Sequence, residues 1–445
     1  MTEERRCATD SAKSSCILSD DVNNLLPYDS VPYEWSVMPQ SSESDVRGIF
    51  ELWNSDSESA RKRVVACAQA LCANVLGGAW KRVSPENFRI RSITGGTSNL
   101  LFLVKLPENI KTVKHEPRNA LLRIFCGTDL ESRLNESVIF TILSERRIGP
   151  QLHGVFPGGR FEQFIPSRPL TTAEISYASV VVKIGQLLAR IHSLDVPIIK
   201  NPGIVDLAQS YLKKLKKLNR RMKHKLVGNM VQASLDTCPA EVNPELLENE
   251  LQIMRRCLEK SNSPVVFSHN DLQELNILLR DQFILDHNGN LNTTNDENPF
   301  VLIDFEYSGY NYRGFDFGNF LCEHMLNYSY NQPPYYTILP QNEPTEEHKN
   351  LFANAYLDEI EKASIELSGA TVTNGSSQQQ RDHKVKELLT EARRFMAVSH
   401  LFWSIWSFKL AEESPIQFDY VSYGIDRLIL YYTHKKDLIE YLHSE

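Results

Sequence analysis

The sequence has no long apolar run, no paired-cysteine motif and no excess of positive charge. No stretch approaches the roughly 18 to 20 apolar residues of a transmembrane helix. The first residues are polar and acidic where a signal peptide has an apolar core. The eight cysteines form no CxxC pair, which argues against a zinc site or a disulfide scaffold and favours free thiols in a reducing compartment. The net charge of −8 argues against broad nucleic-acid binding. We therefore expect a cytoplasmic protein with no stable membrane insertion and no nucleic-acid partner.

The length and composition predict a globular protein of two lobes. The chain has 445 residues, of which 42% are hydrophobic and 23% are charged, so it can bury a large core. The first 45 residues are rich in Ser, Asp and Asn and are expected to be disordered. We assign an N-terminal lobe to 46–165 and a C-terminal lobe to 166–445. Phosphate-loop chemistry of the Walker A type is excluded, because the sequence has no GK[ST] ending after a glycine-rich loop.

Three polar side chains mark the stretch around which the chain is organised. Asp271 and Asn276 lie in a short loop that leads into the apolar segment Ile277–Leu279, and Asp304 follows the apolar segment Phe300–Ile303. If these two segments pair as an antiparallel hairpin, the end of the second returns beside the start of the first. We therefore expect the three side chains to meet at one end of the hairpin.

These residue types suit phosphoryl transfer from a nucleotide. Asp271 would orient or deprotonate an attacking hydroxyl group, and Asn276 and Asp304 would bind Mg²⁺, which prefers oxygen ligands. In isolation, His-x-Asp with a nearby Asn is also a common turn sequence, and the strand that ends in Asp304 is what favours a kinase. We interpret His269 as a structural hydrogen-bonding residue of the loop.

Upstream residues could bind the nucleotide. Gly95–Asn99 separates two alternating segments and predicts a hairpin tip that approaches phosphates, although an ordinary glycine turn has the same pattern. Arg123 interrupts the apolar segment Asn119–Phe125 and needs a partner, for which Glu136 is the candidate. The alternative is a surface arginine at a strand edge. Residues 162–165 would form a hinge whose backbone can bond an adenine.

Three other segments are interpreted from their composition and spacing. The stretch 211–226 is strongly basic at helical spacing, which is typical of a solvated face and less often of contact with a membrane surface. The polar segments 285–299 and 369–381 are expected to be loops, the second of them disordered. The segment 385–442 is expected to be helical. Within it Trp403 and Trp406 share a helix face, which fits either core packing or a binding site.

Several blocks together resemble the choline/ethanolamine kinases, and most closely the choline kinases. They are GGTSN, NALLRIF, ESVIF, LSERRIGPQLHGVFPGGRFEQFIPSRPL, HNDLQELNILL and IDFEYSGYNYRGFDFGNFLCE, and the resemblance extends from about Arg82 to the C-terminus. It implies an α+β, bilobal protein-kinase-like fold with a small N-terminal lobe around an antiparallel sheet and a larger, mainly helical C-terminal lobe. It also implies ATP and Mg²⁺ as cofactors, choline as substrate, and a homodimer.

The resemblance assigns roles to individual residues. Asp271 would be the catalytic base, with Asn276 and Asp304 as metal ligands. The nucleotide-binding candidates are Gly96, Thr97, Ser98, Asn99, Arg123, Glu136, Gln163 and Ile165. The candidates that line or neighbour the choline pocket are Glu306, Tyr307, Glu323, Tyr328, Trp403, Trp406 and Tyr423. Two positions depart from the family pattern, namely Leu275, where glycine is common, and His324, where an aromatic residue is usual.

The aromatic and acidic candidates fit a quaternary cation on physical grounds. A trimethylammonium group has no N–H to donate, so aromatic faces bind it by cation–π attraction, about 2 kcal/mol for a good desolvated ring. Ethanolamine carries a primary ammonium group, which would favour polar acceptors, so the aromatic residues favour choline with ethanolamine as a second substrate. An aminoglycoside-type kinase would need a groove of many carboxylates. A pseudokinase usually lacks a reacting residue, and all three are present here.

Overall fold

The computed structural model describes residues 57–93, 99–125, 130–234, 236–293, 297–368, 378–414 and 416–443. The described chain divides into two compact units, one ending at Arg168 and the other beginning at Pro169. The predicted disordered tail lies outside the described residues. No helix in the described part of the chain is long and apolar enough to span a membrane. The cysteines within these ranges, at positions 67, 72, 238, 257 and 322, are free thiols.

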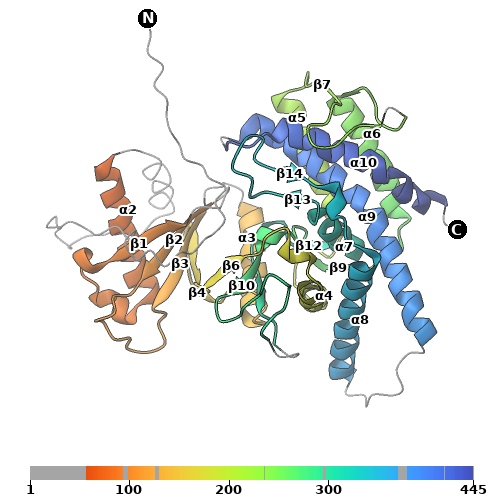
Figure 1. The fold of residues 1–445 in the computed structure, drawn as a ribbon. Helices are drawn as coiled ribbons and strands as arrows, with labels where there is room; N and C mark the ends of the chain where they lie inside the picture. Colours follow the sequence, from red (N-terminus) through yellow and green to blue (C-terminus); the bar gives the residue numbers. More distant parts are fainter. Residues whose placement is uncertain are drawn as a thin grey trace, which may run out of the picture. The chain divides into compact units, whose positions relative to one another are not determined.

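The N-terminal unit is built on a five-stranded antiparallel sheet of order β1-β2-β3-β5-β4 (Figure 1). Its strands are β1 (Arg89–Ile93), β2 (Asn99–Lys105), β3 (Asn119–Phe125), β4 (Leu152–Phe156) and β5 (Gly159–Gln163). Strands β1 and β2 pair directly, as predicted for the segments that flank the glycine-rich turn. The turn residues Gly95 to Ser98 lie outside the described residues.

One face of this sheet is apolar and packs against helix α2 (Glu58–Leu71). Phe102, Val104, Leu122 and Ile124 point to this face because they alternate along β2 and β3, and all four are fully buried. The helix continues as a short π-helical turn, η2 (Cys72–Leu76), and ends at Gly77, whose φ of 66° lies in the left-handed region. The opposite face carries Leu101, Leu103 and Leu121 together with the charged side chains of β3 and β5.

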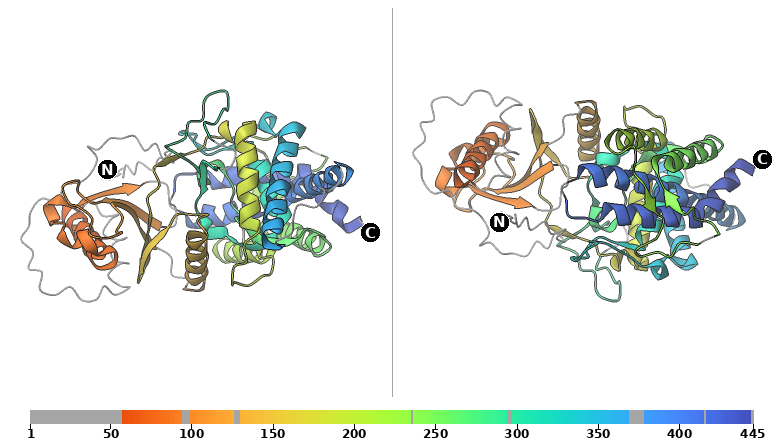
Figure 2. Two further views of the ribbon diagram at one scale, coloured as in Figure 1. Left: turned by 90° about the horizontal axis from the view of Figure 1, so that it is seen from below. Right: turned by 90° about the horizontal axis from the view of Figure 1, so that it is seen from above.

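The C-terminal unit is mainly helical. Its helices are α4 (Ala178–His192), α5 (Ile204–Leu218), α6 (Pro244–Glu259), α7 (Arg313–Glu323), α8 (Glu346–Ser368), α9 (Gln378–Glu413) and α10 (Tyr420–His443). Helices α9 and α10 pack along each other, α7 packs on α9, and α4 and α8 lie side by side in Figure 2. The core of this unit includes the buried faces of α5, α6, α9 and α10.

Short strands of the C-terminal unit flank the loops that carry Asp271, Asn276 and Asp304. Strand β10 (Ile277–Arg280) pairs antiparallel with β11 (Phe300–Leu302), with Ile277 opposite Leu302, so the predicted hairpin is confirmed. Strand β6 (Ser167–Pro169) completes this sheet, whose order is β11-β10-β6. A second pair, β9 (Val265–Ser268) and β12 (Gly309–Tyr312), precedes and follows the loops that carry the candidate residues. Two further antiparallel pairs are β7 (His224–Lys225) with β8 (Glu241–Val242) and β13 (Leu326–Asn327) with β14 (Thr337–Ile338).

Two expectations about element bounds were wrong. The basic stretch 211–226 does not form one helix, because α5 ends at Leu218 and the chain turns at Asn219 before β7. The expected loop 369–381 ends earlier, because α9 begins at Gln378. Arg381 explains the second difference, since its guanidinium bonds Asn354 and Asp358 of α8 and thereby holds the first turn of α9 against that helix.

Candidate active site

The loop between β9 and β10 brings together two of the three central residues. Asn276 closes the short 3₁₀ turn η6 (Glu274–Asn276), and its Nδ2 donates to Asp271 Oδ2 at 2.8 Å and to the Asp271 carbonyl at 2.9 Å. The amide group thereby fixes the Asp271 side chain and leaves its own Oδ1 as the remaining acceptor. The five-residue spacing of Asp271 and Asn276 in the sequence thus allows the two side chains to bond each other within one loop.

The hairpin places Asp304 next to this loop. The backbone N–H of Ile303 donates to the Asn276 carbonyl at 3.0 Å, so Asp304 follows directly after a residue bonded to Asn276. Asp304 itself has φ 64° and ψ 64°, a left-handed conformation in which it begins the turn η7 (Phe305–Tyr307). The predicted convergence of these three residues at one end of the hairpin therefore follows from the strand register.

His269 has the structural role predicted for it. Its Nδ1 accepts the Asp271 backbone N–H at 3.2 Å, and its Nε2 lies 3.0 Å from the Ile303 carbonyl. Because the carbonyl can only accept, the ring is the neutral tautomer with the proton on Nε2. Burial lowers the pKa of His269, which keeps this tautomer uncharged. The imidazole thus ties the loop of Asp271 to the strand that precedes Asp304.

Asp316 anchors the same loop from helix α7. Its carboxylate accepts the backbone N–H of His269 at 2.8 Å and that of Asn270 at 2.7 Å. It also bonds His192 Nε2 at 3.0 Å, at the end of α4. Asn270 has φ 66°, and its side chain donates to the Tyr307 carbonyl. The loop is therefore fixed to two helices and to the segment after Asp304.

The electrostatic surroundings of Asp271 suit a divalent cation. Burial raises the pKa of Asp271 well above its ordinary value, and repulsion from Asp304, Glu323 and Glu306 raises it further. A bound Mg²⁺ would relieve this repulsion, and Asn276 and Asp304 offer the oxygen ligands that it prefers. In the described ranges no three His, Cys, Asp or Glu side chains are grouped as a metal site.

Three of the predicted pocket residues, Tyr307, Trp403 and Trp406, form an aromatic group. The rings of Tyr307 and Trp403 are 5.4 Å apart edge to face, and those of Trp403 and Trp406 are 5.3 Å apart. Trp406 Nε1 donates to the Tyr307 hydroxyl group at 3.0 Å. Trp403 is buried, and its Nε1 donates to Asn319. Trp406 is only half-buried, and it contacts Tyr307, which follows the exposed Glu306 in the chain. Trp403 therefore also packs in the core, and Trp406 presents the more accessible ring.

Three other predicted pocket residues, Glu323, Tyr328 and Tyr423, form a second group. The Tyr328 hydroxyl group donates to Glu323 Oε2 at 2.8 Å and lies 2.8 Å from the Tyr423 hydroxyl group. Arg427 Nη1 bonds Glu323 Oε1 at 3.1 Å and the Tyr423 hydroxyl group at 3.3 Å. Burial raises the pKa of Glu323, and Arg427 opposes this shift. The ion pair with Arg427 was not predicted from the sequence.

A hydrogen-bonded chain connects the two groups through α9. Arg427 Nη2 donates to Ser399 Oγ at 2.9 Å, and Ser399 Oγ donates to Asn319 Oδ1 at 2.8 Å. The same Asn319 oxygen accepts Trp403 Nε1 at 2.8 Å. Asn319 also donates to the carbonyl of Leu272, next to Asp271, at 3.4 Å. The aromatic group, the Glu323 group and the Asp271 loop are thus one connected set of side chains.

The face of the N-terminal sheet that points away from α2 holds an arginine–glutamate network. Arg123 lies opposite Arg160 in the β3–β5 pair, and Glu162 is two residues further along β5 on the same face. Arg123 Nε bonds Glu162 Oε1 at 2.5 Å, and Arg160 Nε bonds the same oxygen at 2.7 Å. Arg160 Nη1 also bonds Glu136 of helix α3 (Leu130–Glu145) at 2.9 Å.

The predicted pairing of Arg123 with Glu136 is therefore wrong. Two arginines that face each other across strands repel, and a glutamate placed diagonally to one of them compensates both. Glu162 occupies this diagonal position, and its pKa is lowered by the two guanidinium groups despite complete burial. Asn99 begins β2 in this sheet, and Gln163 and Ile165 lie at and after the end of β5. Gly96, Thr97 and Ser98 lie outside the described residues.

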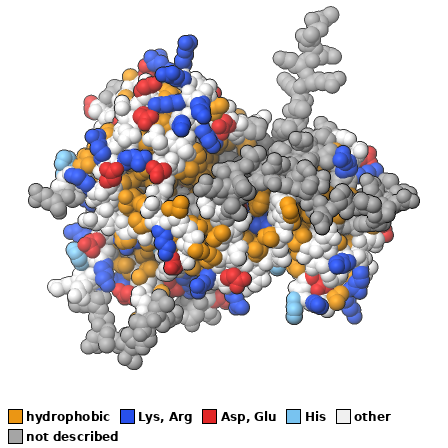
Figure 3. All heavy atoms as spheres, turned by 180° about the vertical axis from the view of Figure 1, so that it is seen from behind, with side chains coloured by type: hydrophobic (Ala, Val, Ile, Leu, Met, Phe, Trp, Pro, Cys, Tyr) orange, Lys and Arg blue, Asp and Glu red, His pale blue; other side chains and the backbone are white. Residues whose placement is uncertain are grey.

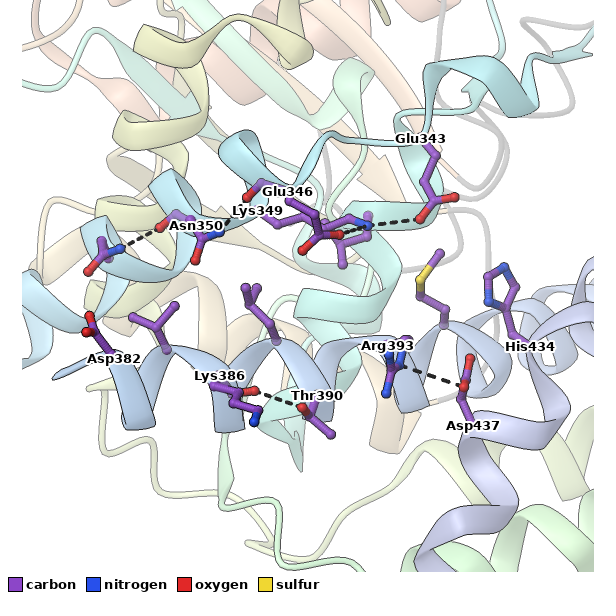
Figure 4. A pocket seen from close by; sticks show the side chains of 15 residues that line it. Glu343, Glu346, Lys349, Asn350, Asp382, Lys386, Thr390, Arg393, His434 and Asp437 are labelled. Atoms are coloured by element: carbon purple, nitrogen blue, oxygen red, sulfur yellow. Dashed lines mark hydrogen bonds and ion pairs between the residues drawn. The ribbon is translucent and has the colours of Figure 1, made fainter. Parts of the chain in front are cut away.

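A separate cavity of about 590 Å³ lies between α8, α9 and α10 (Figure 4). Lys349 on α8 bonds Glu343 and Glu346, and Arg393 on α9 lies 3.7 Å from Asp437 on α10. Several of the charged side chains around this cavity are therefore paired with an opposite charge. None of the predicted catalytic or pocket residues lines it, so it is distinct from the candidate site.

The small antiparallel sheet of one unit and the mainly helical second unit define the fold class as protein-kinase-like. Two solved structures share the fold. A choline kinase from Cryptosporidium parvum has a TM-score of 0.62 and 24% identity, and the match covers 84% of this chain and 96% of that one. An ethanolamine kinase from Plasmodium vivax has a TM-score of 0.60 and 18% identity, and the match covers 89% of this chain and 96% of that one.

Sequence relatives define the family. The profile of the choline/ethanolamine kinase family matches residues 90–432. The human choline/ethanolamine kinase is 37% identical over 395 residues, which cover 86% of this chain and 89% of the relative. Choline kinase A2 of Caenorhabditis elegans is 40% identical over 390 residues, or 83% and 85% of the two chains. The chain belongs to the choline/ethanolamine kinase family, and both the fold class and the resemblance inferred from the sequence are confirmed.

Proposed function

We propose that this protein transfers the γ-phosphoryl group of ATP to choline, forms phosphocholine as the entry step to phosphatidylcholine, and accepts ethanolamine as a second substrate. The observation that carries the proposal is the Asp271–Asn276 pair, fixed beside Asp304 and connected to a group of aromatic side chains. The first part suits phosphoryl transfer and the second suits a methylated ammonium group.

In this mechanism Asp271 accepts a hydrogen bond from the choline hydroxyl group. The hydroxyl oxygen forms the new bond to the γ-phosphorus atom as the bond to the β,γ-bridging oxygen of ATP breaks, and the hydroxyl proton passes to Asp271. The raised pKa of Asp271 favours this proton transfer. Asn276 donates to the Asp271 carboxylate and holds it in position.

Asn276 Oδ1 and Asp304 would hold Mg²⁺, which when bound neutralises charge on the phosphate oxygens. In the N-terminal unit, Arg123 would contact phosphates, with Glu162 and Arg160 fixing its guanidinium group. Glu136 would support this face through Arg160. The turn at Gly96, Thr97, Ser98 and Asn99 would approach the phosphates, and Gln163 and Ile165 would lie at the adenine.

The choline pocket would use both groups of side chains. Tyr307, Trp403 and Trp406 would face the trimethylammonium group, and Tyr328 and Tyr423 would extend this aromatic wall. Glu306 is exposed and would supply negative charge. The charge of Glu323 is balanced by Arg427, so Glu323 would act chiefly by fixing Tyr328.

Steady-state kinetics with choline and ethanolamine side by side test this proposal. We expect kcat/KM to favour choline by roughly tenfold, because one desolvated cation–π contact is worth about 1–2 kcal/mol. Activity should require Mg²⁺ and ATP. A higher kcat/KM for ethanolamine would make this an ethanolamine kinase. Turnover of aminoglycosides but of neither amine would refute both the choline and the ethanolamine assignment.

The resemblance to the family also supports a cytoplasmic homodimer. Light scattering coupled to size-exclusion chromatography tests the assembly, with twice the chain mass of 50.9 kDa as the expected result. A monomer across the micromolar range would contradict it. Fractionation of cells that express the chain tests the location, and recovery in an organelle lumen would contradict it.

A further inference from the structure

We propose that the outer face of α5 and the turn after it form a docking surface for an anionic phospholipid membrane. This basic surface consists of Lys213, Lys214, Lys217, Arg220, Arg221 and Lys225, with the exposed apolar residues Leu218 and Val227. It is separate from the candidate active site, and the inference does not rest on the proposed function.

The sequence around the basic surface is biased toward positive charge. Between Asp206 and Asp236 the chain has eight Lys and Arg residues and no Asp or Glu, whereas the whole protein has a net charge of −8. A solvated helix face usually mixes charges of both signs. A run of one sign on a protein of the opposite net charge is therefore a specific feature of this end of the molecule.

The fold exposes these charges. Leu212 and Leu215 bury the inner face of α5 against the core, so Lys213, Lys214 and Lys217 are left on the outer face. Two other cations of the stretch are neutralised, since Lys216 bonds Glu248 and Lys223 bonds Glu241. Within the described chain, the six cations of the basic surface have no ion-pair partner. Figure 3 shows Lys and Arg side chains gathered at the top of the C-terminal unit, where α5 and β7 lie in Figure 1, with some acidic side chains among them.

The charge of this surface acts locally. At physiological salt the Debye length is about 8 Å, so charges on distant parts of the protein are screened. Clusters of four to eight Lys and Arg on an amphipathic helix are typical of binding to anionic lipid, and each cation strengthens it about fivefold. The basic surface falls within this range despite the overall negative charge.

The apolar residues favour a membrane over a nucleic acid. Leu218 is 50% exposed at the end of α5, and Val227 is 72% exposed just after β7. Such side chains between lysines and arginines suit the boundary between headgroups and acyl chains. A single-stranded nucleic acid would instead need exposed aromatic rings for base stacking. The one aromatic residue of α5, Tyr211, is half-buried against Phe402.

Co-sedimentation of the full chain with vesicles tests the proposal. Vesicles of phosphatidylcholine with about one third phosphatidylserine should bind the protein, and pure phosphatidylcholine should not. The triple variant Lys213→Gln, Lys214→Gln, Lys217→Gln should weaken binding on the order of 100-fold, since three cations are removed. Glutamine is a good helix former, so α5 should persist, as an unchanged Tm would demonstrate.

The matched control removes three exposed lysines from the N-terminal unit, with Lys81→Gln, Lys111→Gln and Lys114→Gln, and should leave vesicle binding unchanged. The variant Leu218→Gln should weaken binding with the charges intact. Salt alone should release the wild-type protein, a readout that does not depend on any variant folding. Equal binding to both vesicle types, equal loss in the control triple, or preferred binding of a mixed-sequence oligonucleotide at the same phosphate concentration would overturn the proposal.

Discussion

Arg427 of α10 forms a buried ion pair with Glu323 of α7, with Nη1 and Oε1 3.1 Å apart and both side chains almost fully inaccessible. The same guanidinium group reaches Tyr423 and Ser399, so one residue connects the acidic side of the candidate pocket with the helix that carries the tryptophans. A buried charge that loses its partner is costly, and this relationship can therefore be measured.

Arg427→Met should lower the free energy of unfolding by about 3–5 kcal/mol, because Glu323 is left buried without its cation. Adding Glu323→Gln should recover much of this loss. Urea unfolding followed by tryptophan fluorescence measures both. As the exposed counterpart, Arg393 lies 3.7 Å from Asp437 with its side chain 55% exposed, and Arg393→Met should cost less than about 1 kcal/mol. Equal losses in the two single variants would show that burial of the pair is unimportant.

Asp271→Asn should lower kcat by roughly 10²- to 10⁴-fold, the usual contribution of a positioned general base. Asparagine retains the size of the side chain, so the loop should persist and ATP should still bind. Isothermal titration with ATP and initial rates with choline separate the two effects. The control is Asp281→Asn, at the exposed position directly after strand β10, and it should leave kcat unchanged. Near-normal turnover in the Asp271 variant would remove this residue from the proposed base role.

Trp406→Ala should raise the KM for choline about 10- to 30-fold and change the KM for ATP less than twofold, because one aromatic face contributes about 2 kcal/mol to binding of a quaternary cation. Trp406→Phe should retain most of the affinity, although it loses the hydrogen bond to Tyr307. Trp403→Ala should in addition destabilise the fold by about 3–5 kcal/mol, since this indole is buried. If Trp406→Ala affected both substrates equally, the indole would serve packing alone.

Glu116 should make the N-terminal unit sensitive to acid. Backbone N–H groups, first that of Val113 and also those of Ala79 and Lys114, lower the pKa of Glu116 from its ordinary value of 4.5 to about 2. Because the pKa is lower in the folded state, the carboxylate stabilises the fold at neutral pH. This stabilisation is lost as the pH falls from 4.5 toward 2.

Glu116→Gln should therefore lower the Tm at pH 7, and the difference from wild type should shrink as the pH falls through that range. Thermal melts at several pH values measure it. The exposed Glu108→Gln is the control and should change the Tm at neither pH. A difference that grew on acidification would contradict the assignment of these hydrogen bonds.

The central hairpin was predictable because two apolar segments flank a polar interruption and strand pairing has few registers. Asn276 and Asp304 each stand at an end of these segments and Asp271 lies in the short loop before the first, so their convergence needed no knowledge of the helices. The partner of Arg123 was not predictable in the same way. It depends on which strand lies next to β3, and β5 is adjacent although its residues are about 40 positions away.

Arg427 and Asn319 were also missed, since helix periodicity marks which face is buried and not which buried polar groups meet. A signal was nevertheless present. Asp426 and Arg427 interrupt an otherwise apolar run, and charges at such positions need partners. Asp426 has them in the backbone N–H groups of Asn229 and Met230 and in the Tyr336 hydroxyl group. Charged residues within apolar helical runs therefore predict buried hydrogen-bond or ion-pair networks.

Asp316 accepts hydrogen bonds from the two residues that precede Asp271 and from His192, so the segment that would receive the substrate proton is tethered to the interior of its unit. A segment held in this way is in place before any ligand arrives. Rearrangements during a catalytic cycle would then involve the substrates and less tightly bonded parts of the chain. The Asp271 loop would keep its position.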